Sequence, residues 1–306
     1  MNYPVYKTPG GMGREPTIMQ QSFPGPGDLD DEMQFYPIDD EISVCLDSEE
    51  QVRAYGAYLL AMFLSDTIAV EHRIVIPAVS AATTAIGGMP ATAAQDMFAI
   101  VADEGFHAEQ SLSYINRLAE RFSFSIDTRA PPFMQSLQMQ RSRLSDPSET
   151  ALWDVINGVV TETRISVELS TFAKNDTLCP TVREICRQHH QDEAYHASQF
   201  RALGQWHWEQ SHPSDRELIA GLYAESILRR NAIDAQRRSM ALHLAMGLSL
   251  EECNKHIRRV YSDDFRIEEA MHTAKPTLRF LDKLGISQHA GFKRTFQENR
   301  FLSKFQ

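Results

Sequence analysis

Apolar and polar residues follow one another along most of the chain with the period of an α-helix. Apolar side chains recur three or four positions apart, a spacing that places them on one face of a helix. One such series runs from Tyr55 to Ile68 and follows Ser48 and Gln51, which have the spacing of a capping box. No stretch shows a strong strand pattern. The sequence therefore predicts an all-α protein whose helices exceed the average length of about 11–12 residues.

Prolines and glycines indicate where the predicted helices begin and end. Pro77 is expected to end the first helix, and Gly87 and Gly88 are expected to end a short helical piece after it. Residues 123–146 are expected to form a linker, and Pro276 is expected to interrupt the chain near its end. The main helices are expected over residues 48–76, 90–122, 146–173, 180–211 and 214–246.

The two ends of the chain differ from its middle. Residues 1–47 are rich in proline and glycine, which predicts an extended arm. Residues 212–306 are expected to form accessory helices, and we therefore expect one domain over residues 48–306. Two capping boxes open accessory helices, and phenylalanines at near-helical spacing predict an amphipathic end that docks on the body or on a partner subunit. These residues are Ser214 with Glu217, Ser249 with Glu252, and Phe292, Phe296, Phe301 and Phe305.

Composition and charge exclude several classes of protein. The 306 residues are 42% hydrophobic and 23% charged, as in globular proteins, and the formal net charge of −11 argues against a nucleic-acid partner. No apolar run approaches the roughly 20 residues of a membrane span, and no signal peptide is evident. The four cysteines form no CxxC pair, so reduced thiols and a cytoplasmic location are expected. They are Cys45, Cys179, Cys186 and Cys253.

One short motif occurs twice. The segment DEGFHAEQ at residues 103–110 is repeated as DEAYHASQ at residues 192–199. Each copy has a glutamate and a histidine three positions apart, on one face of a helix. Two such pairs from two helices are half of a carboxylate-bridged two-metal site in a helical bundle. The two pairs are Glu104 with His107 and Glu193 with His196.

The usual recipe for such a site adds one glutamate from each of two further helices. Glu71 and Glu162 are the best candidates, because each lies in an apolar stretch where an unpaired acid facing the core would be costly. They precede Glu104 and Glu193 by similar intervals. Glu168 is the rival to Glu162, but it lies about 240° further round a helix, so both cannot point at the same metal.

The second copy of the motif carries an additional histidine. His189 lies four residues before Glu193, on the stripe that also holds His196, whereas the equivalent position before Glu104 is Ile100. His190 points about 100° away and is expected to be an ordinary polar residue. Asp103 and Asp192 precede the glutamates of the two motifs. Each is expected to accept the spare ring N–H of a ligand histidine.

This ligand pattern resembles the ferritin-like diiron N-oxygenases typified by p-aminobenzoate N-oxygenase, and the additional histidine is its specific part. The resemblance implies a ferritin-like bundle with two irons per chain. One iron would be held by Glu71, Glu104 and His107, and the other by Glu162, His189, Glu193 and His196, with Glu104 and Glu193 bridging.

The resemblance also implies the chemistry. Two irons would activate O2, the co-substrate, to oxidise an amine nitrogen to hydroxylamine, nitroso or nitro. Electrons would come from an external donor, because nothing in the sequence resembles a flavin or nicotinamide site. Members of the family are typically homodimers that serve natural-product biosynthesis. A small-molecule or carrier-bound amine is the expected substrate.

Residues about one helical turn from the ligands are candidates for the substrate pocket. They are Phe63, Asp66, Thr67, Gly158, Val159, Ile165 and Glu168. If Asp66 and Glu168 line the pocket without partners, they favour a cationic or amino-bearing substrate and oppose a free carboxylate. Pairing of these acids with Arg73 or Arg164 would remove that preference.

Other functions remain open at the level of sequence. The same ligands could serve C–H hydroxylation or desaturation, and a ferritin-like chain could store iron or scavenge peroxide without an organic substrate. A degenerate bundle acting as a binding module is a third alternative, which seven intact ligands oppose. Glutamate and histidine ligands fit iron and manganese comparably, and only the resemblance favours iron.

Overall fold

The computed structural model describes residues 33–125, 131–164, 166–230 and 234–298. These residues are almost entirely helical, and their one β-type pairing is an isolated parallel bridge between Gln34 and Leu178. The chain is therefore all-α, as predicted. Within the described residues, no helix has the length and apolar character needed to cross a membrane.

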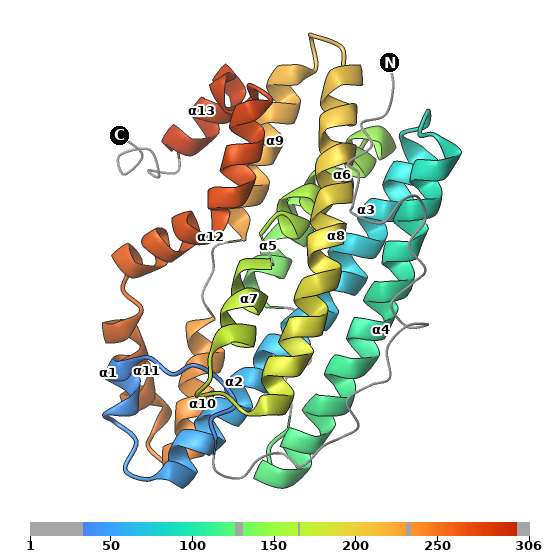
Figure 1. Cartoon of the computed structure of the whole chain (residues 1–306). Coiled ribbons are helices and arrows are strands. Elements are labelled where there is room, and N and C mark those ends of the chain that lie inside the picture. Colours follow the sequence, from blue (N-terminus) through green and yellow to red (C-terminus); the bar gives the residue numbers. More distant parts are fainter. Residues whose placement is uncertain (1–32, 126–130, 165, 231–233, 299–306) are drawn as a thin grey trace.

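The helices follow one another with short connections, and π-helical turns interrupt the first long run (Figure 1). The first half of the chain forms α1 (Asp40–Ser43), α2 (Glu49–Val70), the π-helical η2 (Glu71–Val75), α3 (Ile76–Ser80), the π-helical η3 (Ala81–Ala85), α4 (Ala91–Phe122) and α5 (Pro132–Arg141). The second half forms α6 (Pro147–Glu162), α7 (Ser166–Lys174), α8 (Pro180–Gln210), α9 (Arg216–Arg229), α10 (Ala235–Met246), α11 (Leu250–Val260), α12 (Asp263–Lys283), the 3-10 turn η4 (Ile286–Gln288) and α13 (Ala290–Glu298).

Four long helical segments form the bundle that positions the motifs. Helix α2 packs on α4, and α6 with α7 packs on α8 (Figure 1). The largest apolar cluster joins η2, α3, α6 and α8, and it includes Val75, Ile156 and Phe200, all without measurable exposure. Gly158 allows α6 to approach its neighbours, because a Cβ there would lie 2.5 Å from the Cβ of Ala78 and 2.6 Å from the Cε1 of Phe200.

The C-terminal helices cover one side of this bundle. Helix α10 packs on α2 and α11, while α9 packs on α6 and α13. In α13, Phe292 and Phe296 are buried with ring centroids 4.8 Å apart, so this end docks on the body of the same chain. Phe301 and Phe305 lie outside the described residues. At the other end Phe35 is fully buried and contacts the ring of Phe122 edge-on.

Prolines end fewer helices than the sequence suggests. Pro77 was expected to stop the first helix, yet helical backbone continues through α3 and η3. It lies in the first turn of α3, directly after a π-helical turn, where a missing N–H donor is tolerated. Pro276 lies inside α12 and does not interrupt it.

Connections and caps also differ from the expectations at several places. The expected linker contains α5, and the ranges 146–173 and 214–246 each divide into two helices. Ser214 caps nothing: α9 begins one residue later than Asp215, and the carboxylate of Glu217 accepts instead from the backbone N–H of Gly291 at 2.6 Å. The capping box of Ser249 and Glu252 is confirmed.

Candidate metal centre

The repeated motifs lie on two of the long helices of the bundle. The first copy is on α4 and the second on α8. Glu71 is the first residue of the π-helical turn η2, and Glu162 is the last residue of α6. All seven candidate ligands are at most 4% exposed. The four helical segments therefore direct seven polar side chains into the interior.

These side chains form two sets that share one glutamate. Within each set, one donor atom per residue lies within 4.8 Å of all the others. Glu104 belongs to both sets, which is the position of a bridging carboxylate. The first set is Glu71, Glu104, His107 and His189, and the second is Glu104, Glu162, Glu193 and His196.

His189 lies in a different set from the one that the resemblance implied. Its Nε2 is 2.9 Å from an oxygen of Glu193 and 3.6 Å from an oxygen of Glu71. Its ring also packs on the ring of His107, with centroids 3.9 Å apart. The imidazole therefore extends from α8 toward the α4 half of the cluster. Two histidines meet in the first set, whereas the second set has His196 alone.

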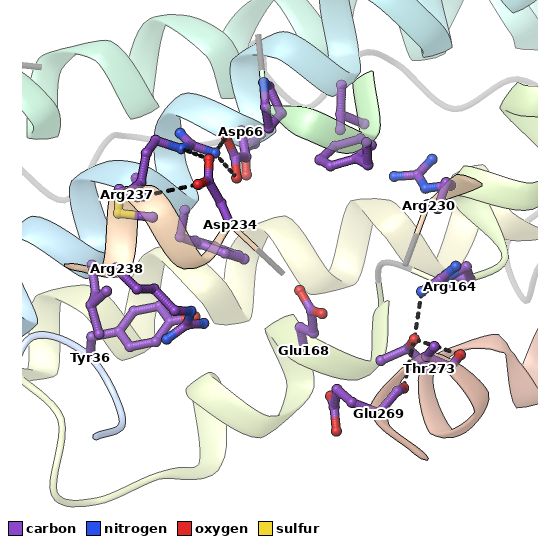
Figure 2. Close-up of a pocket in the computed structure, with 18 residues that line it drawn as sticks. Tyr36, Asp66, Arg164, Glu168, Arg230, Asp234, Arg237, Arg238, Glu269 and Thr273 are labelled. Atoms are coloured by element: carbon purple, nitrogen blue, oxygen red, sulfur yellow. Dashed lines mark hydrogen bonds and ion pairs between the residues drawn. The ribbon is translucent and has the colours of Figure 1, made fainter. Parts of the chain in front are cut away.

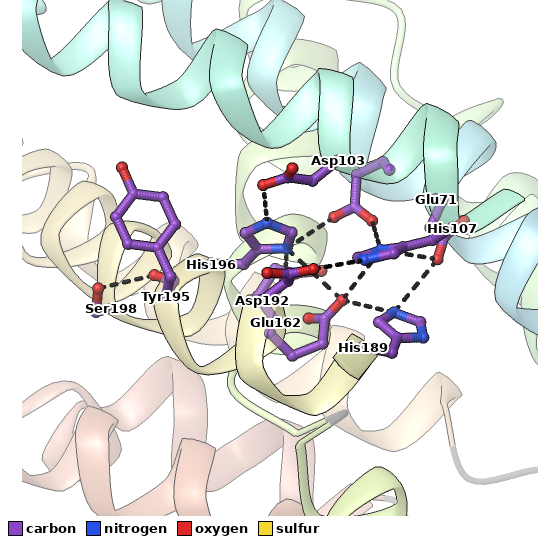
Figure 3. Close-up of polar contacts among 11 residues, drawn as sticks. Glu71, Asp103, His107, Glu162, His189, Asp192, Tyr195, His196 and Ser198 are labelled. Atoms are coloured by element: carbon purple, nitrogen blue, oxygen red, sulfur yellow. Dashed lines mark hydrogen bonds and ion pairs between the residues drawn. The ribbon is translucent and has the colours of Figure 1, made fainter. Parts of the chain in front are cut away.

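The two aspartates contact the histidines crosswise (Figure 3). The Nε2 of His107 on α4 lies 3.2 Å from Asp192 on α8, and the Nε2 of His196 on α8 lies 3.3 Å from Asp103 on α4. Each aspartate thus orients the histidine of the other motif. Since the opposite nitrogen of each ring faces the glutamates, these contacts favour one orientation of each imidazole toward the centre.

Several buried oxygens in this cluster have no hydrogen-bond donor. Both carboxylate oxygens of Glu71 and one oxygen each of Glu162 and Glu193 accept no hydrogen bond from the described residues. Buried polar atoms in folded proteins are normally satisfied. Four glutamates and three imidazoles are also a donor set that suits iron or manganese. The residues present therefore fit a pair of divalent cations.

The pKa shifts of the candidate ligands also fit a metal site. Burial raises the pKa of Glu71 and of Glu162 well above the usual range, and neighbouring glutamates add to this. For His107, burial lowers the pKa, but hydrogen bonds to Asp192 and Glu104 outweigh it and raise the pKa to about 10. Without a metal the cluster holds protons that a bound cation would replace.

A cavity of about 250 Å³ lies near the metal centre, although none of the seven candidate ligands lines it (Figure 2). Its wall includes Thr67 and Val70, four residues and one residue before Glu71 on the same helical run. Arg230 also faces it and contacts the hydroxyl of Thr161, the neighbour of Glu162 in sequence. The cavity therefore lies beside the segments that carry Glu71 and Glu162.

The predicted pocket residues divide into two groups. Phe63, Asp66, Thr67 and Glu168 line the cavity. Gly158 and Val159 do not, because they face α3 and α8 in the apolar core. Ile165 lies outside the described residues. Glu168, the sequence-level rival of Glu162, follows the break between α6 and α7 and belongs to neither metal-binding set, and His190 is likewise in neither.

The charges around the cavity are more balanced than the sequence suggested. Arg237 binds both carboxylate oxygens of Asp66, at 2.7 and 2.9 Å, and also binds Asp234. Asp66 is therefore neutralised, and by neither of the arginines considered from sequence. Arg164, Arg230 and Arg238 line the same cavity. The expectation that acids in the pocket oppose a carboxylate does not follow from this lining.

The sequence offered no signal for these arginines. Arg230 and Arg237 come from α9, α10 and the segment between them, more than 30 residues after the last motif, and form no pattern with it. Packing of α10 on α2 brings Arg237 to the cavity, and Arg230, which follows α9, reaches it because α9 packs on α6.

Comparison with known proteins identifies a family. A family model described as P-aminobenzoate N-oxygenase AurF matches residues 46–285, which is most of the chain. A search of curated proteins finds no match.

Proposed function

Because the chain belongs to the p-aminobenzoate N-oxygenase family, we propose that it is a diiron N-oxygenase that oxidises the nitrogen of an amine to hydroxylamine, nitroso or nitro. The observation that carries the proposal is the buried cluster of four glutamates and three histidines, near a cavity that Thr67 and Val70 line. Two irons in this cluster would supply the activation of O2 that the reaction requires.

We assign the two irons to the seven side chains of the cluster. Glu104 contributes to both sets and is the bridging carboxylate. Glu193 is the second candidate bridge, because its Oε1 lies within 4.0 Å of ring nitrogens from His107, His189 and His196. The ligands are Glu71, Glu104, His107, Glu162, His189, Glu193 and His196.

The protein contributes position and exclusion of water. Apolar residues such as Val70 and Phe63 form part of the cavity wall beside the cluster, and the metal-binding carboxylates themselves are buried. An amine held in the cavity is thereby kept next to the segments that carry Glu71 and Glu162. Burial of the cluster also limits the access of bulk water to the oxidising centre.

The remaining parts of the proposal concern partners. Electrons come from an external donor, and the substrate is a small-molecule or carrier-bound amine. We further propose a homodimer that serves natural-product biosynthesis in the cytoplasm, with residues 1–47 as an arm and residues 48–306 as one domain. The size of the cavity suits a small-molecule amine.

Two measurements test the proposal. Metal analysis of the purified protein after anaerobic iron loading should find about two irons per chain, the number that the two sets hold. The reduced, iron-loaded protein is then mixed with O2 and a panel of aryl and alkyl amines. Mass spectrometry should detect products in which the amine nitrogen carries added oxygen.

The outcomes separate this function from the others that the cluster permits. Oxygen inserted at carbon, or a new C=C bond, would point to a hydroxylase or desaturase. Iron oxidation by O2 or peroxide with no organic product from any amine would point to storage or scavenging. A chain that retains no iron would contradict every diiron reading.

A further inference from the structure

The cavity holds charged groups that face one another without pairing (Figure 2). Arg230 packs over the ring of Phe133, with its guanidinium carbon 5.3 Å from the ring centroid, and contacts the hydroxyl of Thr161. It forms no ion pair with any described residue. Burial, with the neighbouring charge of Arg164, lowers the pKa of Arg230 to about 9, and the charges of Glu162 and Glu168 offset this only in part.

Glu168 is the corresponding anion. Its carboxylate faces the cavity from α7 and makes no hydrogen bond or ion pair with the described residues. Glu168 is an exposed residue, and its carboxylate is only partly removed from water at the cavity. This desolvation raises the pKa of Glu168, Arg164 lowers it, and Glu269, which faces the same space, raises it further. A carboxylate in these surroundings favours a ligand that brings a positive charge or hydrogen-bond donors.

Two other acids of the cavity, Asp66 and Asp234, do not compete for this role, whereas Glu269 faces the same space as Glu168 and adds negative charge to it. Both carboxylate oxygens of Asp66 accept from one terminal nitrogen of Arg237, and Asp234 accepts from the Nε of the same guanidinium. Arg238 stands over the ring of Tyr261, 4.7 Å from its centroid. On one side of the cavity, Asp66 and Asp234 thus pair with Arg237. Elsewhere, neither Arg230 nor Glu168 forms an ion pair with the described residues.

We propose that Arg230 and Glu168 determine substrate choice, and that the substrate is a zwitterionic amine whose anionic group binds Arg230 and whose ammonium group binds Glu168. The inference rests on the proposed function only in taking this cavity as the substrate site. A guanidinium offers a planar pair of donors to a carboxylate or phosphate, and a carboxylate accepts from an ammonium group. A volume of about 250 Å³ admits a compound built on one aromatic ring.

The test is ligand binding to the iron-loaded full chain, measured by isothermal titration calorimetry without reductant. Four probes separate the charges: 4-(aminomethyl)benzoate carries both, 4-methylbenzoate only the anion and benzylamine only the cation. p-Aminobenzoate carries the anion with an uncharged amine. The zwitterion is expected to bind on the order of tenfold or more tightly than each of the other three.

Two variants assign the charges to residues. Arg230→Gln should reduce the affinity for the zwitterion, 4-methylbenzoate and p-aminobenzoate by on the order of tenfold. The affinity for benzylamine should not change. Glu168→Gln should reduce the affinity for the zwitterion and for benzylamine. The affinities for 4-methylbenzoate and p-aminobenzoate, which have no ammonium group, should not change. Arg279→Gln and Glu251→Gln, at exposed positions outside the cavity, are the matched controls. A purely structural role would weaken all four probes alike.

The proposal is overturned if the zwitterion binds no more tightly than both single-charge probes, if neither variant discriminates between them, or if no probe binds. These outcomes are independent of turnover. Selective binding of the zwitterion without oxidised product in the mass-spectrometric assay would leave the cavity assignment standing and contradict the N-oxygenase function.

Discussion

Replacing Asp192 by alanine is expected to weaken iron binding through a histidine of the other motif. Asp192 lies on α8, but its carboxylate is 3.2 Å from the Nε2 of His107 on α4. Both residues are at most 2% exposed, so bulk water has little access to the position of the carboxylate. Loss of such a contact allows the ring of a ligand histidine to turn and lowers its basicity.

The magnitude follows from what each substitution removes. Loss of an outer hydrogen bond to a ligand histidine typically costs 10- to 100-fold in metal affinity, or about 1.4 to 2.7 kcal/mol. Asp192→Asn keeps an oxygen that can accept from the ring N–H but loses the charge, so we expect the iron affinity to fall about tenfold. Asp192→Ala removes the acceptor altogether, so the loss of iron affinity should approach about a hundredfold.

Competition between the protein and a coloured Fe(II) chelator under anaerobic conditions measures this loss. Asp103→Ala should have a similar effect through His196, 3.3 Å away, because the two contacts are crosswise equivalents. Asp176→Ala, at an exposed position, is the matched control. If the Asp192→Ala variant is folded and binds two irons within twofold of the wild-type affinity, the contact between Asp192 and His107 does not support iron binding.

Three further predictions concern stability. Gly158→Ala should lower the free energy of unfolding by about 1–3 kcal/mol, because its Cβ would meet the side chains of Ala78 and Phe200 at 2.5 and 2.6 Å; Gly105→Ala, with nothing within 4 Å, should raise it by about 0.5–1 kcal/mol, and urea unfolding of the two variants decides. The buried hydroxyl of Tyr114 has no hydrogen-bond partner among the described residues, and burial raises its pKa from 10.0 to about 12. As the pH rises, the unfolded chain therefore loses this proton before the folded chain does, and the free energy of unfolding falls between pH 10 and about 12. Tyr114→Phe should make this fall smaller in urea titrations. The same dependence on pH in the variant and the wild type would contradict the prediction. Removal of iron by a chelator should lower the melting temperature in calorimetry, since the metal binds only the folded cluster, and an equal melting temperature with and without iron would count against a built metal site.

The asymmetry between the two motifs is a separate outcome of the structure. The position equivalent to His189 is Ile100, which is fully buried in the apolar core. The additional imidazole thus belongs to α8 but reaches the first set, where it packs on His107. One side of the cluster consequently has two imidazoles from two different helices.

The sequence alone was sufficient for the local features of the site. A glutamate and a histidine three positions apart share a helix face whatever the rest of the chain does, so both motifs could be recognised before the fold was known. Glu71 and Glu162 could be found because a charged residue in an apolar stretch is costly without a partner. The all-α class followed in the same way, from the period of apolar positions.

Only the tertiary structure decided the relations between helices. Which aspartate orients which histidine, and which set His189 joins, depend on how α4 and α8 are turned toward each other. Asp66 meets Arg237, 171 residues later, because α10 packs on α2. The break after Glu162 directs Glu168 to the cavity and away from the cluster. Helical periodicity describes one helix at a time, whereas these contacts are set by packing between helices and leave no trace in residue spacing.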